Sequence, residues 1–324
     1  MTIRWGILGA GKIASKWAED LPLAGNAALQ AVWARDPRKA EEFGRCHGAS
    51  RVAESLEDLL DAADVDAVYV ATPNMLHAEG IRRCLEAGKP VLAEKPFGLS
   101  RAQVEPLVEL ARARGVLCVE ALWTRFLPSF RTALEIVQSG RIGAVRHIVA
   151  DFGFAAASDP ASRLWDPSQG GGSLLDIGIY PLFLARAFLG NPDRIRATMD
   201  LSETGVDATC RAELEWFDGA TATLLSTFSE NTPCLAVIEG EEGRLVLQRR
   251  FHMPTTVVLH DADGVERIDP PAGGVGYEHE IRHFGECLEQ GLSESPLWSL
   301  TDTLDLSLLM DRVREAAGPA GAAS

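Results

Sequence analysis

The sequence predicts an α/β protein: a Rossmann-type, doubly wound parallel sheet, followed by an α+β region with a large, mainly antiparallel, open-faced sheet. Short apolar strands alternate with helical segments up to residue 121, which is typical of parallel strands with crossover helices. The glycine-rich segment 9–14 (GAGKIA) joins the first strand to the first helix. After residue 190, strands follow one another with only short turns between them, which indicates antiparallel pairing.

The first half is expected to form a dinucleotide-binding Rossmann domain over residues 1–122. The helix at 37–47 begins with a proline and is followed by Gly48, as helix boundaries often are. Ser55 opens another helix with the spacing of a capping box. We expect strands at 3–8, 28–33, 65–71, 90–93 and 116–121, and helices at 15–21, 37–47, from 55, 75–87 and 101–114.

The second half, residues 123–324, is expected to form a substrate-binding and dimerisation domain. A sheet covered by helices on one face leaves its other face open, which predicts a homodimer or higher homo-oligomer through this sheet. The helix at 173–189 is apolar on most sides and should be buried. We expect strands at 145–154, 195–201, 208–216, 220–228, 235–239, 244–248 and 256–260, helices at 129–139, 173–189, 278–290 and 300–316, and a long loop at 155–172.

The composition argues against several classes of partner. The 324 residues carry a formal net charge of −15, which is unfavourable for nucleic acids and for anionic membranes. The chain has no apolar run of about 18 residues, and its first strand begins too early for a secretory signal. The six cysteines are scattered without a C-x-x-C pair, which favours a reduced, cytoplasmic protein. A small-molecule substrate is therefore expected.

The glycine turn predicts a diphosphate site. Gly9 permits the tight turn, Gly11 lets a pyrophosphate approach the backbone, and Ala14 allows close packing of the helix on the strand. The following helix directs its unpaired N–H groups and its positive dipole end to the same point. The turn Thr72-Pro73-Asn74 comes directly after a buried strand and should face the same cofactor.

The end of the second strand favours NADP, with NAD as the alternative. An NAD site places an acid against the ribose 2′-OH about twenty residues after the glycine turn, whereas arginine accommodates the 2′-phosphate of NADP. Ala34 occupies the usual position of the acid, Arg35 follows it, and Arg38 lies one turn further on. Asp36 could be the ribose acid if the register is shifted by two residues.

Lys95, Asp176 and Tyr180 are the candidate catalytic residues. Lys95 follows a strand at the cofactor edge, next to Glu94, although a plain salt bridge between these two is an equal alternative. Asp176 and Tyr180 lie four residues apart on the buried helix, where the alternative is a core tyrosine bonded to Asp176. A nearby ammonium lowers the pKa of a phenol, so Lys95 and Tyr180 together could exchange a proton with an alcohol.

These motifs resemble the glucose–fructose oxidoreductase/inositol dehydrogenase (Gfo/Idh/MocA) family. The similarity rests on GAGKIA, on TPN with His77, on EKP at 94–96 and on GGGSLLDIGIY at 170–180, in this order along the chain. Within the family, the segment 120–126 and Tyr180 look most like dihydrodiol dehydrogenases and NADP-dependent D-xylose dehydrogenases, whereas many members have histidine at that position.

The resemblance implies a dehydrogenase or reductase acting on CH–OH groups of a sugar, polyol or cyclic diol. It implies that Lys95 and Tyr180 are catalytic with support from Asp176, that Trp123 and Phe154 line the substrate pocket with Arg163 and Trp165 nearby, and that the family's dimer interface is the open sheet. The cofactor contacts expected from the motifs and the resemblance are Gly9, Gly11, Lys12, Ile13, Arg35, Arg38, Thr72, Pro73, Asn74, His77, Glu94 and Lys95. The alternative is a nucleotide sensor without catalysis; such members have usually lost the lysine.

Two further motifs suggest metals, but no metal is expected. The segment 279–283 spells H-E-x-x-H, the signature of zinc proteases. On a helical wheel both histidines should point to solvent, and no third ligand is apparent. The segment 260–264 resembles the start of a calcium loop but lacks the distal glutamate, so a hairpin turn is expected there.

Overall fold

A computed structural model describes residues 2–271 and 273–318, which form two compact units. The first unit contains the described residues of Met1–Phe126 and Ala272–Leu304, and the second those of Leu127–Pro271 and Asp305–Ser324. A segment near the C-terminus, distant in sequence, therefore belongs to the first unit.

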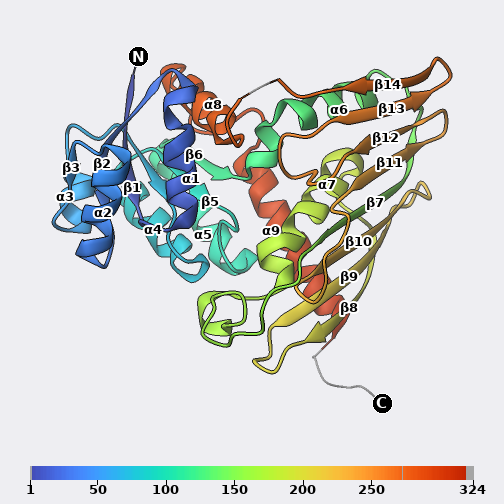
Figure 1. Ribbon diagram of the computed structural model, residues 1–324, viewed down its shortest axis with the longest axis horizontal. Coiled ribbons are helices and arrows are strands. Elements are labelled where there is room, and N and C mark those ends of the chain that lie inside the picture. The colour runs from blue at the N-terminus through green and yellow to red at the C-terminus, as the bar shows by residue number, and fades with distance from the viewer. Residues whose placement is uncertain (1, 272, 319–324) are drawn as a thin grey trace. The chain divides into compact units, whose positions relative to one another are not determined.

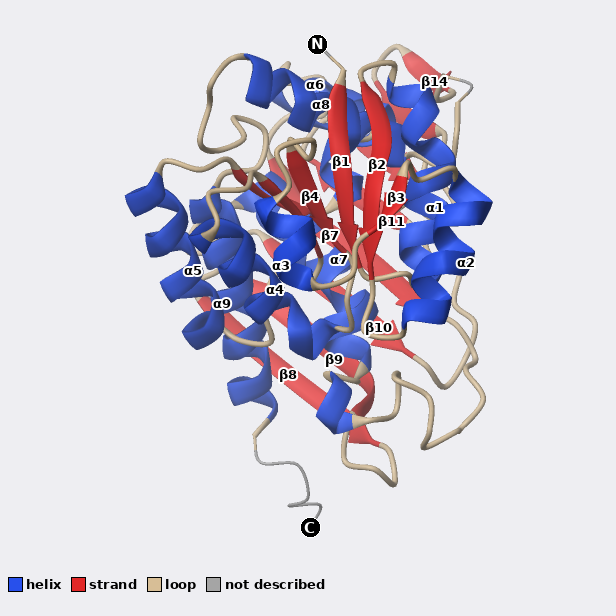
Figure 2. Cartoon of the chain, turned by 90° about the vertical axis from the view of Figure 1, so that its left-hand side faces the viewer, coloured by secondary structure: helices blue, strands red, loops and turns tan. Residues whose placement is uncertain are grey.

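The first unit is built on a six-stranded parallel sheet, sheet A. Its order is β3-β2-β1-β4-β5-β6, so the strand order reverses between β1 and β4, where open α/β sheets bind their ligands. Figure 2 shows α1 and α2 on one side of these strands and α3, α4 and α5 on the other. The strands are β1 (Ile3–Leu8), β2 (Ala27–Trp33), β3 (Arg51–Val52), β4 (Ala67–Val70), β5 (Val91–Glu94) and β6 (Cys118–Ala121).

The helices of this unit agree closely with the prediction. The predicted boundaries of α2 and α5 are confirmed at both ends, α1 begins at Lys12 rather than at residue 15, and the short strand β3 is absent from the prediction. The Ser55 side chain accepts a hydrogen bond from the Asp58 N–H, which confirms the cap. The helices are α1 (Lys12–Asp20), η1 (Leu21–Ala24), α2 (Pro37–His47), α3 (Leu56–Asp61), α4 (Asn74–Glu86), α5 (Arg101–Arg114), η2 (Trp123–Phe126) and α8 (Tyr277–Glu289).

Each face of sheet A has its own core. On one face, aliphatic residues of α3, α4 and α5 pack against the strands, joined by Leu300 from the beginning of α9 (Leu300–Ala317). The other core is a chain of buried aromatic rings. Trp17 stacks on Tyr69 with 4.2 Å between ring centroids, and Trp5 packs against Trp17 at 5.1 Å and against Phe284 of α8 at 4.9 Å. α8 is thereby packed onto the first unit.

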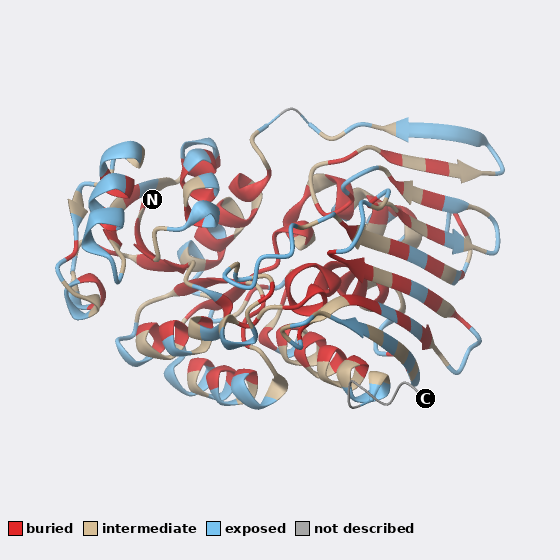
Figure 3. Ribbon diagram, turned by 60° about the horizontal axis from the view of Figure 1, so that its bottom comes forward, coloured by how far each residue is buried: buried red, intermediate tan, exposed pale blue. Residues whose placement is uncertain are grey.

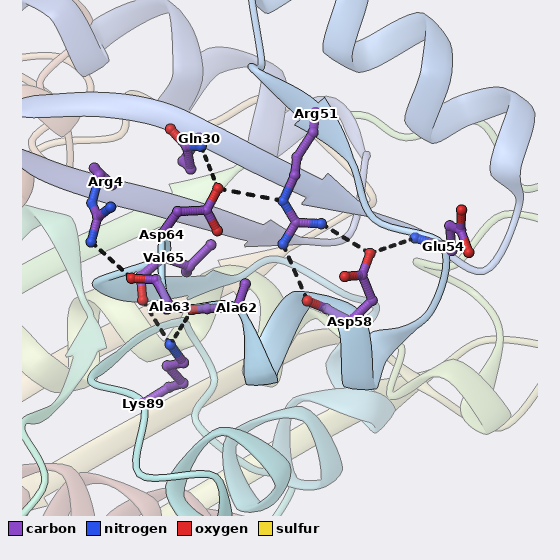
Figure 4. Close-up of polar contacts among 10 residues, drawn as sticks. All are labelled: Arg4, Gln30, Arg51, Glu54, Asp58, Ala62, Ala63, Asp64, Val65 and Lys89. Carbon is purple, nitrogen blue, oxygen red and sulfur yellow. Dashed lines mark hydrogen bonds and ion pairs between the residues drawn. The ribbon is translucent and has the colours of Figure 1, made fainter.

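Charged side chains connect the segments that lead into the strands of sheet A (Figure 4). This edge of the sheet is opposite the edge where the cofactor is expected. Lys89 donates to the carbonyl oxygens of Ala62 and Val65 at 2.7 and 2.8 Å, which connects the residues before β5 and β4. Arg51 bonds the Asp58 carboxylate at 2.9 Å. These contacts stabilise the sheet on the side away from the expected chemistry.

The second unit is an eight-stranded sheet, sheet B, with the order β14-β13-β12-β11-β7-β10-β9-β8 (Figure 1). All pairs are antiparallel except β7 with β10, which confirms a mainly antiparallel sheet. The edge strand β14, absent from the prediction, is almost entirely exposed (Figure 3). The strands are β7 (Val145–Gly153), β8 (Arg194–Leu201), β9 (Asp207–Glu215), β10 (Thr221–Thr227), β11 (Ala236–Gly240), β12 (Arg244–Leu247), β13 (Val257–Asp261) and β14 (Gly264–Ile268).

Helices pack on one face of sheet B (Figure 1). They include α6 (Pro128–Gln138) and the buried α7 (Ile179–Leu189), whereas the short η3 (Pro167–Gln169) lies in the segment between β7 and α7. The predicted helix at 173–189 is correct except that its first turn, η4 (Leu174–Gly178), is a π-turn, a feature often found at functional sites. The stretch Pro167–Leu189 has the length and hydropathy of a membrane span, contrary to the expectation, but 78% of its most apolar window is buried inside the protein.

The six cysteines, all of them described, are free thiols. Five of them are buried and only Cys46 is exposed. Burial raises the pKa of the Cys84 and Cys210 thiols to about 12, so these side chains are inert core residues.

Candidate functional site

The glycine turn has the geometry that a diphosphate site requires. Gly9 has φ +109°, and a Cβ there would lie 2.6 Å from the Ala71 carbonyl oxygen. Gly11 is exposed, no side chain caps the helix α1 that follows it, and a Cβ there would meet only the Ala71 oxygen, at 4.0 Å. Lys12 and Ile13 are exposed in the first turn of α1. The open N-terminus of α1 can therefore receive an anionic group.

Arg35 lines a cavity of about 640 Å³ at the end of β2, together with Trp33, Leu56 and Arg83. The Asp36 carboxylate instead accepts a hydrogen bond from the Arg38 N–H at 3.1 Å and caps α2. Asp36 is thus engaged by its own helix, whereas Arg35 lines the cavity. Arg38 is exposed and is not among the residues that line it.

His77 connects two turns at the carboxyl edge of sheet A. Its Nδ1 lies 2.8 Å from the Pro96 carbonyl oxygen and its Nε2 2.7 Å from the Thr72 carbonyl oxygen. Both partners are acceptors, so both contacts are hydrogen bonds only when both ring nitrogens carry hydrogen. Pro73 precedes α4 and Asn74 is its buried first residue. The predicted cofactor residue His77 therefore braces the 72–74 turn against the Glu94-Lys95-Pro96 turn.

Lys95 is half-buried directly after β5, where it follows Glu94 in the sequence and its charge acts on Glu120. The Tyr69 hydroxyl donates to the Glu94 Oε1 at 2.5 Å. Glu120, at the end of β6, accepts from the Phe97 N–H at 3.1 Å. Burial raises the pKa of Glu120, and the positive charge of Lys95 is one of the effects that oppose this rise. Glu120 is absent from the predicted site residues. Its position in the sequence could have indicated it, because a carboxylate near the carboxyl end of a buried strand is unusual in a core.

Trp123 is the predicted substrate residue of the first unit. It is buried in η2, and its ring stacks on Tyr277 with 4.5 Å between centroids and 19° between planes. Tyr277 begins α8, more than 150 residues later in the sequence, so no local pattern could indicate this pair.

Asp176 and Arg163 form an ion pair in the second unit. The Arg163 Nη1 lies 3.0 Å from the Asp176 Oδ1, and the Asp176 side chain is nearly buried. Asp207, which is absent from the prediction, accepts hydrogen bonds from the Ser173 hydroxyl at 2.8 Å and the Leu174 N–H at 2.7 Å. Burial raises the pKa of Asp207. These bonds hold the start of the π-turn that carries Asp176.

The buried Tyr180 lies among aromatic rings. Its centroid is 5.7 Å from Phe152 and 5.3 Å from His252, and His252 stacks on Phe152 at 4.0 Å. His252 is absent from the predicted residues, since it lies on an irregular segment between β12 and β13. The tyrosine thus sits beside an imidazole in an otherwise apolar cluster.

Phe154 and Trp165 anchor the long loop of the second unit. Trp165 is buried against Phe228 in an edge-on contact at 5.4 Å, and its Nε1 donates to the Ala157 carbonyl oxygen at 2.7 Å. Phe154 packs on the same Phe228 at 5.3 Å. Both predicted substrate residues therefore contribute to a small apolar cluster that holds the loop in place.

The H-E-x-x-H histidines do not point to solvent, so that expectation is wrong. His283 is half-buried, with its Nε2 2.7 Å from the Ser295 hydroxyl, and His279 lies 3.4 Å from Glu278. Tertiary contacts with the segment after α8 cover this side of the helix, which a helical wheel cannot show. Among the described residues, no three His, Cys, Asp or Glu side chains gather to hold a metal ion. The segment 260–264 is a hairpin turn, as expected.

The fold and the site together define a dinucleotide-binding oxidoreductase. A parallel sheet with this strand order, an open glycine turn at its reversal point and a lysine after β5 form the nucleotide-binding half. The sequence model described as "Oxidoreductase family, NAD-binding Rossmann fold" (GFO_IDH_MocA) matches residues 3–122, and the Gfo/Idh/MocA C-terminal domain matches residues 130–246. The chain belongs to the Gfo/Idh/MocA family, as its motifs suggest.

Relatives with known names match along almost the whole chain. The chain is 35% identical to mouse trans-1,2-dihydrobenzene-1,2-diol dehydrogenase over 330 residues, which cover 98% of both proteins. It is similar to the 3-ketoreductase KijD10 from Actinomadura kijaniata, crystallised with NADP and TDP-benzene, with a TM-score of 0.87 and 32% identity over 98% of each chain. The aldose-aldose oxidoreductase from Caulobacter crescentus gives a TM-score of 0.89 and 26% identity, again over 98% of both chains. The predicted dihydrodiol dehydrogenase branch is confirmed.

Proposed function

We propose that this protein is an NADP-dependent dehydrogenase or reductase that acts on a secondary alcohol or carbonyl of a sugar, polyol or cyclic dihydrodiol. The end-to-end similarity to a dihydrodiol dehydrogenase carries the proposal, because it extends over both halves of the chain. The position of Arg35 at the cavity, with Asp36 engaged as a helix cap, supports NADP over NAD. The crystallised ketoreductase, which was solved with NADP, adds to this preference.

We assign proton transfer to Lys95 and Tyr180. The bound nicotinamide supplies the hydride acceptor for the carbinol carbon. The Tyr180 phenolate takes the hydroxyl proton of the alcohol, and the Lys95 ammonium favours that phenolate. Asp176, paired with Arg163 on the turn before Tyr180, supports these two residues. The related ketoreductase has been studied as a lysine-to-alanine and as a tyrosine-to-phenylalanine variant, which is consistent with roles for these residue types.

The test compares Lys95→Ala and Tyr180→Phe with Lys39→Ala, an exposed lysine on α2. Both site variants should bind NADPH within about threefold of the unmodified protein but lose turnover at least 100-fold, roughly the contribution of general acid–base catalysis. NADPH binding is measured by fluorescence, and turnover by nicotinamide absorbance with a panel of diols and sugars. Full activity in either variant removes that residue from the mechanism. Binding without redox change across the panel favours a nucleotide sensor.

We also propose a homodimer or higher homo-oligomer through the open face of sheet B. A row of valines crosses four paired strands on this face: Val149 pairs with Val237, Val237 with Val246, and Val246 with Val258. Val149 is 39% exposed. Exposure of an apolar row to water is unfavourable, and a second copy of the chain would cover it. Val149→Asp should lower the mass measured by light scattering to that of a monomer. An unchanged mass would place the interface elsewhere.

We also propose that the protein is cytoplasmic, because its scattered cysteines without a C-x-x-C pair favour a reducing compartment. Five buried free thiols are consistent with that reducing compartment. Fractionation of cells that express the full chain would test this assignment.

A further inference from the structure

Glu280 is a buried carboxyl that the proposed chemistry does not use. It lies on α8 with a relative exposure of 1%, and neither of its oxygens has a hydrogen-bond partner among the residues that the structure describes. Tyr277, one turn earlier on the same helix, and Glu280 both act electrostatically on Tyr69. An unpartnered buried carboxyl is unfavourable for folding, so its presence calls for an explanation.

The ionisable groups around Glu280 are mostly acidic. Glu94 from β5 and Asp20 from α1 are the charges that act on it, and Glu280 in turn acts on Tyr69 from β4. The Asp20 carboxylate accepts hydrogen bonds from the backbone N–H groups of residues 275–277. Burial, together with the charges of Glu94 and Asp20, raises the pKa of Glu280 well above its usual range.

The aromatic core connects this helix to the cofactor edge. Phe284 lies one turn after Glu280 on the same side of α8 and packs against Trp5. The rings continue through Trp17 to Tyr69, whose hydroxyl donates to Glu94 at 2.5 Å. A hydrogen bond from a phenol stabilises the anionic form of the carboxylate that accepts it. The negative charge is therefore more stable on Glu94 than on Glu280, and the proton is more stable on Glu280.

We propose that Glu280 holds a proton while Glu94 carries the negative charge, so that these two carboxyl groups together bear one negative charge when Glu280 is neutral and two after Glu280 loses its proton to solvent. This inference rests on the proposed function, because it takes Glu94, an expected cofactor contact next to Lys95, to lie near the nicotinamide ring. An oxidised nicotinamide ring is cationic and a reduced ring is neutral. The second charge therefore favours NADP⁺ over NADPH. Glu280 acts through Glu94 and is a positioning residue.

The test measures the ratio of the NADP⁺ and NADPH dissociation constants by fluorescence from about pH 6 to about pH 10, a range that extends well above the usual carboxyl pKa. The ratio cancels the titration of the cofactor phosphates. In the unmodified protein, rising pH should shift the ratio about tenfold toward NADP⁺, the effect of one added charge at moderate distance in a protein interior. Glu280→Gln should keep the neutral-pH ratio throughout. Glu286→Gln, which removes an exposed charge from the same helix, should follow the unmodified protein.

A flat ratio in the unmodified protein overturns the proposal, and so does the same pH dependence in Glu280→Gln. Thermal unfolding without cofactor gives a second readout. The folded state holds the Glu280 proton to higher pH than the unfolded state, so this residue destabilises the protein increasingly as pH rises above about 4.3. Glu280→Gln should melt at a higher temperature than the unmodified protein, with a difference that widens as pH rises, and a constant difference overturns the idea that Glu280 holds a proton in the folded state.

If the glutamine variant does not fold, Glu280→Leu provides the same test, since it removes the ionisable group at similar volume. Its ratio should also be independent of pH, and a pH-dependent ratio overturns the proposal. If the unmodified protein binds neither nucleotide, the proposed function fails. The melting comparison then still decides whether Glu280 holds its proton in the folded state.

Discussion

Replacing Gly9 by alanine should destabilise the protein and disrupt its nucleotide site. The residue has φ +109°, a conformation that L-residues rarely adopt, and strain of this kind costs on the order of 1–3 kcal/mol. The new Cβ would also lie 2.6 Å from the Ala71 oxygen and 3.0 Å from the Thr72 nitrogen, both of them backbone atoms that cannot rotate away. Overpacking adds about 1–3 kcal/mol. We expect a total loss of about 3 kcal/mol in the free energy of unfolding.

Gly11→Ala is the matched control, because it should weaken NADPH binding without lowering the stability of the fold. Gly11 has an extended φ of −92°, and the added Cβ would have no neighbour closer than 4.0 Å. The free energy of unfolding should therefore change by less than about 1 kcal/mol. The methyl group would nevertheless stand where a diphosphate approaches the backbone, so NADPH affinity should fall at least tenfold.

Urea unfolding of the cofactor-free proteins and fluorescence titration with NADPH measure the two effects. Normal stability in Gly9→Ala would refute the backbone reasoning, because the turn would then tolerate a side chain. Unchanged NADPH affinity in Gly11→Ala would show that the diphosphate does not lie at this turn. A loss of both properties in Gly11→Ala would mean that the control also alters the fold.

Three further changes have separate expected outcomes. Arg35→Ala should weaken NADPH binding at least tenfold in fluorescence titrations, because a contact to the 2′-phosphate is lost. NADH affinity should not change. An equal loss of NADPH and NADH affinity would refute this role. Lys89→Met should lower the free energy of unfolding in urea by about 1–2 kcal/mol, since two carbonyl oxygens lose their donor, and an unchanged midpoint would contradict this. The Arg4 guanidinium lowers the pKa of Asp66, so Asp66 stabilises the fold above its unfolded pKa of about 3.9 and this stabilisation disappears as pH falls through its folded pKa. Asp66→Asn should therefore melt below the unmodified protein at neutral pH and approach it in acid, whereas a pH-independent difference would oppose the ion-pair explanation.

The sequence by itself determined the parts of the fold that local chemistry controls. The boundaries of α2 and α5 followed from proline, glycine and apolar spacing, and the alternation of strands with helices predicted sheet A. The glycine turn was also readable, because the φ of Gly9 and the exposure of Gly11 are properties of a short segment. Counting along the chain favoured Arg35 as the contact to a 2′-phosphate, with Asp36 as the alternative contact to the ribose.

The tertiary structure decided which side chains meet. Asp36 is engaged by its helix, His77 spans two carbonyl oxygens, and Glu120 bonds the backbone after Lys95. The strands β3 and β14 are too short or too exposed to carry a sequence signal, and their pairing depends on a neighbouring strand. The return of α8 to the first unit brings Tyr277 to Trp123 from a distant part of the chain. Local patterns report the period and the ends of an element, whereas contacts between distant residues arise only when the packed chain excludes water between them.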